Sequence, residues 1–249
     1  MKYTTDKEGN LIFDVSAGFS NSSQRNNIYV DKVLKKSTAL VACNATSMGM
    51  GLEYTGWSIP QKYLELKQQE DNLIKFCQED SIVLDYYKKT LPAMYAAWLV
   101  RAKDCYAPNE VHDVLSYAIN MYMGSKVTYF KVNTLVSEIV SDISIRNLPI
   151  VMSGKFAGFG HVVCLVGFKA KKEFLEGYNK TKTITEDLLK FIYEWTIDDP
   201  YGDFRNDYKI VLSGNNIPMT SLQFNTMFNP RESTTVKFAH RFNKPPVKS

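Results

Sequence analysis

Hydrophobic positions follow two different periodicities in the two halves of the chain. Over about 58–124, apolar side chains recur every three or four residues, the spacing of amphipathic helices. The clearest stripe consists of Val111, Val114, Leu115, Ala118, Ile119 and Tyr122. This pattern predicts a mostly helical region over about 58–124.

An earlier helix is predicted to begin at Cys43 and to stop at Gly56, because glycine readily adopts the left-handed conformation that ends helices. Ser58, Pro60 and Gln61 then have the spacing of a cap, a first-turn proline and a capping-box partner. They predict a second helix that runs to about residue 78. Further helices are expected over about 92–103 and 109–123.

Short β-branched runs dominate the chain after residue 125. Strands are predicted at "KVTYFKV", "LPIVMSG", "GHVVCLVGF", "YKIVL" and "TTVKFAHRF", with a helix at "NTLVSEIVSDISIRN". "FIYEWTIDDPYGD" predicts a strand that ends in a turn, because Asp-Pro followed by Gly favours a turn. Helices followed by strands predict an α+β fold, in which a helical N-terminal half packs on a largely antiparallel C-terminal sheet.

Length and composition suit one domain over 22–242. Its 45% apolar and 22% charged residues are an ordinary globular balance. The domain is expected to follow a polar lead-in over 1–21, which holds one short apolar stretch, "LIFDV". A charged surface insertion with a short helix is expected near 170–190, and a polar tail over 243–249.

Charge and hydropathy exclude several classes of protein. The net charge of +4 is too small for a nucleic-acid-binding surface, and no apolar run reaches the roughly 18–20 residues of a membrane span. The polar start "MKYTTDKEGN" has no apolar core of a signal peptide, so we expect synthesis in the cytoplasm. The four cysteines form no paired motif, which predicts reduced thiols and neither a metal nor another cofactor.

Three residues combine into candidate chemistry. Cys43 is predicted at a helix N-terminus, whose partial positive charge favours a thiolate. His161 opens an apolar strand, and Asp199 ends the strand that follows. Together they can form a nucleophile, a base and a carboxylate that orients the base.

Each of these residues also has a structural interpretation. A lone cysteine is more often a small core residue, a lone histidine is equally often a buried core group, and Asp-Pro is a common turn. Asp198 competes with Asp199, because neighbouring strand residues point to opposite faces. Of the two other histidines, His112 is expected on a helix surface, and His240 is expected to be partly buried on a closing strand.

The chain resembles papain-superfamily cysteine peptidases related to the bacteriocin double-glycine leader peptidases of phages and Gram-positive bacteria. The stretches that carry the resemblance are "SQRNN" (23–27), "CNATSMGM" (43–50), "LPIVMSGKFAGFGHVVCLVGF" (148–168) and "IDDPYGD" (197–203). The resemblance implies a papain-like fold whose central cysteine helix packs on the sheet. Ala45, Gly49 and Gly51 would then allow a close approach between helix and sheet.

The resemblance also implies the site. Cys43 would be the nucleophile, His161 the base and Asp199 the orienting carboxylate, since the carboxylate of the family directly precedes a proline. Gln24 and the backbone N–H of Cys43 would form the oxyanion hole. The expected reaction is hydrolysis of a peptide bond through a thioester.

The expected substrate is a peptide cross-link of the cell wall or a bond in a phage or bacterial protein. The chain would then act within a virion or secretion assembly, or after release to the wall. Two alternatives stay open. One is an acyltransferase of the transglutaminase or arylamine acetyltransferase type, which uses the same order of Cys, His and Asp. The other is a papain-like structural or binding protein without activity.

Overall fold

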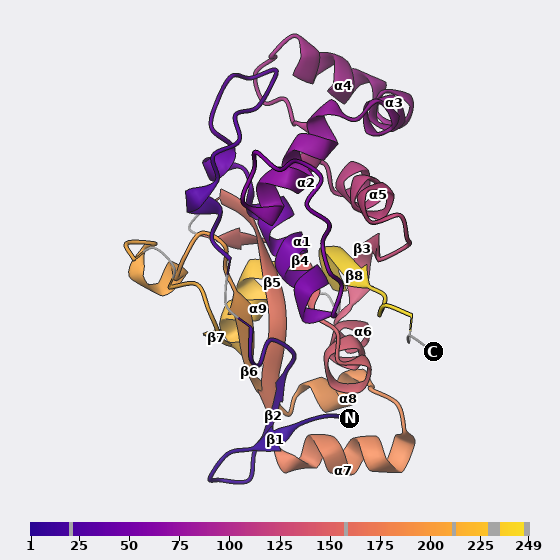
Figure 1. Ribbon diagram of the computed structural model, residues 1–249. Coiled ribbons are helices and arrows are strands. Elements are labelled where there is room, and N and C mark those ends of the chain that lie inside the picture. Colours follow the sequence, from indigo (N-terminus) through magenta and orange to yellow (C-terminus); the bar gives the residue numbers. More distant parts are fainter. Residues whose placement is uncertain (20–21, 157–158, 211–212, 229–234, 247–249) are drawn as a thin grey trace.

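An antiparallel sheet forms the centre of the chain, with α1 on one face and α9 on the other (Figure 1). The computed structural model describes residues 1–19, 22–156, 159–210, 213–228 and 235–246. Within these residues the sheet has eight strands, and all of its paired strands are antiparallel. The predicted α+β class with an antiparallel sheet is therefore confirmed.

The longest strand, β5, organises the sheet. It pairs with β4 over its first half and with β6 over its second, and the order continues through β8 to β3 on one side and β7 on the other. The strands are β1 (Thr4–Thr5), β2 (Leu11–Asp14), β3 (Thr128–Leu135), β4 (Ile150–Phe156), β5 (Phe159–Ala170), β6 (Ile192–Asp198), β7 (Ile217–Thr220) and β8 (Thr235–Phe242).

The predicted polar lead-in differs from the structure, because it contributes two strands to the sheet. β2 pairs with residues 167–170 of β5, on the same edge that β4 occupies farther along. Leu11, Phe13 and Val15 are buried there, and Phe13 stacks on Phe168. The alternating pattern of "LIFDV" is that of a half-buried strand, which needs a partner from the far end of the chain.

The helices gather in two groups around the sheet, with α2 to α5 at one end and α7 and α8 at the other (Figure 1). Their bounds are α1 (Cys43–Tyr54), α2 (Gln69–Glu79), α3 (Ser81–Thr90), α4 (Pro92–Leu99), α5 (His112–Met123), α6 (Val136–Ser141), α7 (Lys172–Thr181), α8 (Glu186–Leu189) and α9 (Ser221–Phe228). A π-helical turn, Asp142–Arg146, continues α6. No described helix is both long and apolar enough to cross a lipid bilayer.

The predicted ends of α1 are confirmed. The helix begins at Cys43, and Gly56 adopts a left-handed conformation with φ of 88° just beyond its end. The N–H groups of Gly56 and Trp57 donate to the carbonyls of Glu53 and Leu52, the bond pattern of a Schellman motif.

The prediction of a helix that begins near Ser58 is wrong, because α2 begins only at Gln69. Side chains from helices elsewhere in the chain form hydrogen bonds with backbone groups of the residues between Ser58 and Gln69. The Tyr122 hydroxyl donates to the carbonyl of Pro60, and the N–H of Tyr63 donates to Oδ1 of Asn72 over 2.8 Å. These tertiary partners replace the bonds that a helix would have made.

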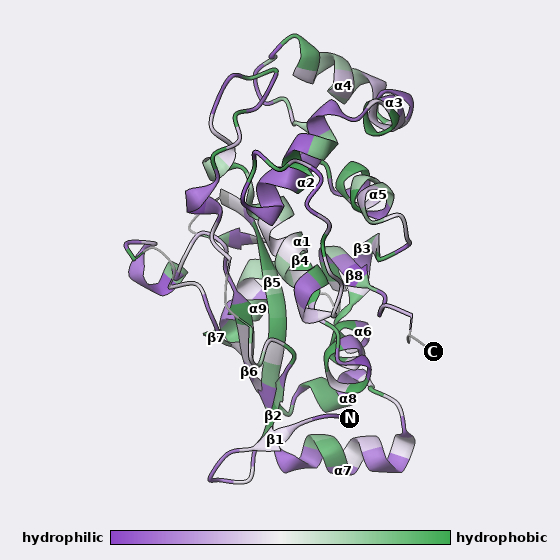
Figure 2. Cartoon of the chain, viewed as in Figure 1, coloured by the Kyte–Doolittle hydropathy of each residue, from purple (hydrophilic) through white to green (hydrophobic). Residues whose placement is uncertain are grey.

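Several other elements differ from the predictions. The segment near 170–190 forms α7 and α8 and is not confined to the surface, since Phe174 and Leu188 are buried. Figure 2 shows the mixed hydropathy of α7 beside the strongly hydrophobic β5. β7 and α9 were not predicted. Of the predicted strand at 208–212, residues 208–210 are not in a strand and 211–212 lie outside the described residues.

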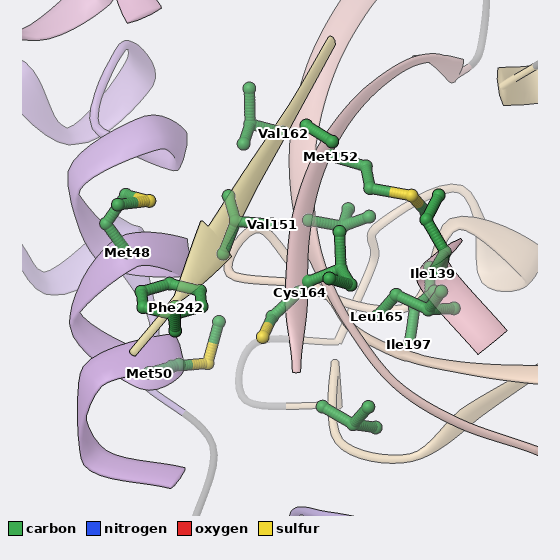
Figure 3. Close-up of a cluster of buried hydrophobic side chains, with 14 of the residues drawn as sticks. Met48, Met50, Ile139, Val151, Met152, Val162, Cys164, Leu165, Ile197 and Phe242 are labelled. Carbon is green, nitrogen blue, oxygen red and sulfur yellow. The ribbon is translucent and has the colours of Figure 1, made fainter. Parts of the chain in front are cut away.

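Helix α1 packs on the face of the sheet that presents Val151 and Cys164, whereas Met152 and Leu165 point to the other side (Figure 3). Phe242 of β8 lies against the helix between Met48 and Met50 in the same view. All seven side chains are fully buried. The sheet and the helix that carries Cys43 therefore share one core.

Only one of the three small residues expected to allow this packing does so. A methyl group on Gly51 would come within 2.3 Å of the Phe242 ring, whereas one on Gly49 would meet nothing within 4 Å. Ala45 packs in a separate small cluster with Tyr29 and other residues before and after α1. Gly51 alone is required for the helix to approach β8.

Two glycine substitutions in α1 are expected to change stability in opposite directions. Gly51→Ala forces a methyl group into a buried aromatic ring and should lower the free energy of unfolding by about 1–3 kcal/mol. Gly49→Ala meets open space and should raise it by up to about 1 kcal/mol through helix propensity alone. Urea unfolding of both variants measures this, and equal effects of the two changes would contradict the packing described.

Candidate active site

Three elements meet beside the first residues of β5, where one edge of the strand is open. Among the described strands, β6 pairs with β5 only from Cys164 onward, whereas His161 pairs with Gly154 of β4 on the other edge. β6 ends at Asp198, so Asp199 is the first residue beyond it. The N-terminus of α1 reaches the same place, which brings residues from three distant parts of the sequence together.

Cys43 is the first residue of α1 and is half-buried. No side chain caps this helix end, because Ala42 precedes it. The thiol donates a hydrogen bond to Oδ1 of Asn44 over 3.3 Å, and it lies close enough to the His161 ring to raise the pKa of that ring. The uncapped N-terminus of the helix therefore places partial positive charge and backbone N–H groups beside the thiol.

His161 and Asp199 form a buried pair. Nε2 of His161 lies 2.7 Å from Oδ1 of Asp199, and both side chains are buried. The backbone N–H of Tyr201 donates to the same carboxylate oxygen over 2.8 Å, and the N–H of Asp199 donates to the carbonyl of Gly214. Because Nε2 lies at Asp199, an ion pair between the thiol and the ring would use Nδ1.

The surroundings of His161 favour its protonated form. Burial by itself disfavours the imidazolium and lowers the pKa of His161. Hydrogen bonds to Asp199 and Cys43, and the negative charge of these two groups, outweigh burial and raise this pKa to about 10. The rings of Phe156, Tyr201 and Tyr208 present their edges or faces to the imidazole and restrict its position.

The structure separates Asp198 from Asp199 as the strand geometry predicts. Asp198 points away from His161, accepting hydrogen bonds from the Tyr54 hydroxyl over 2.7 Å and from the N–H of Asn216. Burial raises the pKa of Asp198 to about 6, although both hydrogen bonds favour its charged form. Asp198 therefore joins the sheet to α1, and Asp199 is the carboxylate at His161.

Gln24 lines the same hollow as Cys43 and His161, despite its distance in sequence from Cys43. It is buried in a 3₁₀ turn, Gln24–Asn26, whose first N–H donates to the carbonyl of Pro200 over 2.9 Å. Nε2 donates one hydrogen bond, to the carbonyl of Ala39 over 2.8 Å. This contact fixes the orientation of the amide and leaves its second N–H for another acceptor.

Two hollows open on either side of Cys43 and His161. The smaller one has a volume of about 320 Å³, and Gln24, Arg25, Tyr201 and Tyr208 contribute to its walls. The larger one, of about 590 Å³, extends between α4, α5, β3 and β8. An extended chain that passes over the thiol could therefore place a group in a hollow on each side.

The prediction that His112 lies on a helix surface is wrong. Its ring is half-buried, it lines the larger hollow, and its Nδ1 lies 2.9 Å from Nε2 of the fully buried His240. Sequence spacing gave no sign of this pair, because the two residues lie 128 positions apart. Within the described residues, no group of three His, Cys, Asp or Glu side chains could hold a metal ion.

Comparisons with known proteins give no relative of this chain. No family model matches its sequence, no curated protein matches it, and no solved structure matches it.

Asp198→Asn should alter how stability depends on pH. The carboxyl has a pKa of about 4 in an unfolded chain and about 6 in the folded protein, so the folded state holds its proton more tightly. Its contribution to stability is complete below pH 4 and is lost as pH rises through 6. The stability of the wild type relative to Asp198→Asn should therefore fall by up to about 3 kcal/mol between pH 4 and pH 8. Urea unfolding across this range measures the difference, and a constant difference would contradict it.

Proposed function

We propose that the protein is a cysteine peptidase that hydrolyses a peptide bond, with Cys43 as nucleophile. The observation that carries the proposal is the placement of Cys43 beside His161 in the walls of the same two hollows, with Nε2 of His161 2.7 Å from the Asp199 carboxylate. A half-buried thiol that opens on two hollows is suited to reach a substrate.

The reaction would follow from the positions of these groups. The Cys43 thiolate attacks the carbonyl carbon of the substrate, and the C–N bond breaks as the imidazolium of His161 gives its proton to the leaving amine. The resulting thioester is attacked by a water molecule, whose proton passes to His161. The acid product leaves, and the thiolate–imidazolium pair is restored. Asp199 keeps the imidazole in the required orientation throughout.

Gln24 would stabilise the tetrahedral intermediates of both steps. Its free amide N–H and the backbone N–H of Cys43 are proposed to donate to the oxyanion. The anchoring of Gln24 to Ala39 and Pro200 supports this role, because an oxyanion hole requires donors whose positions are fixed before the reaction. These two anchors also join it to the segments that carry the thiol and the carboxylate.

A papain-like fold is the fold that we propose for this arrangement. Its support is an N-terminal helix that carries the thiol at its first residue and packs on β5, followed by an antiparallel sheet that supplies histidine and then aspartate. Peptide cross-links of the bacterial cell wall are the first substrates to test, since a mildly basic chain suits an anionic wall.

The first test measures how fast each cysteine reacts with iodoacetamide at pH 6. Cys43 is expected to react at least tenfold faster in the wild type than in His161→Ala, because only the wild type has an imidazolium beside the sulfur. Cys77 and Cys164 serve as internal controls, since burial raises the pKa of both thiols. Peptide mapping by mass spectrometry identifies the labelled residue.

Two outcomes would count against the proposed site. Equal labelling of Cys43 in wild type and His161→Ala would show that no ion pair forms. Rapid labelling without release of any acid product, but with transfer to an added amine, would favour an acyltransferase.

Gln24→Ala separates oxyanion stabilisation from thiol activation. Alkylation forms no oxyanion, so its rate at Cys43 should stay within about twofold of the wild type. Turnover of a peptide substrate should fall by about 10²–10³-fold, the usual cost of losing one oxyanion donor. A parallel fall in both rates would instead indicate that Gln24 supports the structure of the site.

A further inference from the structure

The larger hollow beside Cys43 has an apolar part to its wall. Leu91 and Met94 contribute from α4 and its start, Phe130 and Phe238 from β3 and β8, and Val162 from β5. A cavity of about 590 Å³ with such walls has room for a large side chain and favours an apolar or aromatic one. The carboxylates of Glu110 and Asp113, which also line it, disfavour an acidic side chain.

His112 brings a polar atom into these apolar walls. Its ring stacks on Phe130, at 5.1 Å between centroids, and on Phe238, at 5.3 Å. Its Nδ1 contacts Nε2 of His240. Burial lowers the pKa of His112 to about 4 and that of His240 still further, so both rings are neutral.

The position of the shared proton follows from the surroundings of His240. Nδ1 of His240 is buried and has no hydrogen-bond partner among the described residues. A buried N–H without an acceptor is rarer and less tolerated than a buried lone pair, so Nδ1 of His240 is the unprotonated nitrogen. Nε2 of His240 then carries the proton and donates it to Nδ1 of His112.

This assignment makes Nε2 of His112 a hydrogen-bond donor. A neutral imidazole whose Nδ1 accepts carries its one proton on Nε2. No described residue hydrogen-bonds to that nitrogen, and His112 lines the hollow. His240 therefore acts as a positioning residue, which sets the tautomer of His112.

We propose that His112 determines specificity by selecting a tyrosine-like side chain of the substrate, one with an aromatic body and a hydroxyl at its end. The apolar walls would receive the ring, and Nε2–H of His112 would donate to the hydroxyl oxygen. Glu110 and Asp113 also line the hollow, and their carboxylate oxygens are of the type that accepts hydrogen bonds from hydroxyl groups. The inference rests on the proposed peptidase, because it assigns a substrate group to the hollow beside its nucleophile.

Dipeptidyl chloromethyl ketones, which alkylate active-site thiols, test this assignment. Two series place Tyr, Phe, Leu, Lys or Ala either next to the ketone or one residue before it. In one of the two series, the reagent with Tyr should inactivate Cys43 about three- to tenfold faster than the reagent with Phe, which is the range for one neutral hydrogen bond. The reagent with Ala should be the slowest of that series. Mass spectrometry confirms that Cys43 is the labelled residue.

Matched variants isolate the hydrogen bond from the shape of the hollow. His112→Phe keeps a ring between Phe130 and Phe238 but removes the donor, so the rates for Tyr and Phe should become equal. His112→Gln retains a donor and should retain a preference for Tyr. His240→Leu should reduce the preference and His240→Gln, which can still donate to Nδ1, should preserve it. Iodoacetamide labelling of Cys43 should be unchanged in all four.

The outcomes distinguish this inference from the proposed function. Failure of iodoacetamide to label Cys43 rapidly in the wild type overturns the peptidase itself. Rapid labelling with no preference for Tyr over Phe in either series overturns the role of His112 alone. A preference for Lys would also overturn it, since the carboxylates would then decide the specificity.

Discussion

The contact between His161 and Asp199 depends on where β6 ends, and the rest of the site depends on that contact. If β6 continued its pairing along β5, a strand would cover the edge beside His161, and neither the Asp-Pro turn nor the start of α1 could reach it. Because β6 ends at Asp198, the next carboxylate comes within 2.7 Å of the imidazole. The open edge of one strand thus creates the space in which the thiol, the base and the carboxylate meet.

Buried polar groups fix the elements around this edge. Asp198 accepts from the Tyr54 hydroxyl, which joins the end of β6 to the last turn of α1, and Ser47 of the same helix donates to the carbonyl of Val162 in β5. Gln24 joins the N-terminal segment to the turn after β6. Since an unsatisfied buried polar group costs about 1–3 kcal/mol, such bonds hold these segments in one arrangement. The hydrogen bonds that satisfy these buried polar groups therefore also fix the positions of the residues in the site.

The two hollows beside Cys43 and His161 are where a substrate could reach the proposed catalytic residues. The proposed peptidase needs a thiolate, a proton donor and a fixed oxyanion donor, and the residues proposed for these roles, Cys43, His161 and Gln24, all line the smaller hollow. The pair formed by His112 and His240 is a second polar contact near this site, and no step of the proposed reaction uses it. Its two neutral rings differ from the charged state favoured at His161, although all three histidines are at least half-buried. The difference lies in their partners, which are a carboxylate and a thiol in one case and another imidazole in the other.

The sequence by itself determined the features that depend on local physics. The start of α1 at Cys43, its end before Gly56, the strand that carries His161 and the opposite directions of Asp198 and Asp199 follow from capping, β-branched runs and strand alternation. Only the tertiary structure decided that residues 57–68 are not helical, that the first strands join the sheet and that His112 meets His240. In each of these cases the segment contacts a side chain or a strand of another element, and in two of them that element lies more than a hundred residues away in the sequence. Local periodicity has no information about such a partner, because it reflects only which face of a segment is buried.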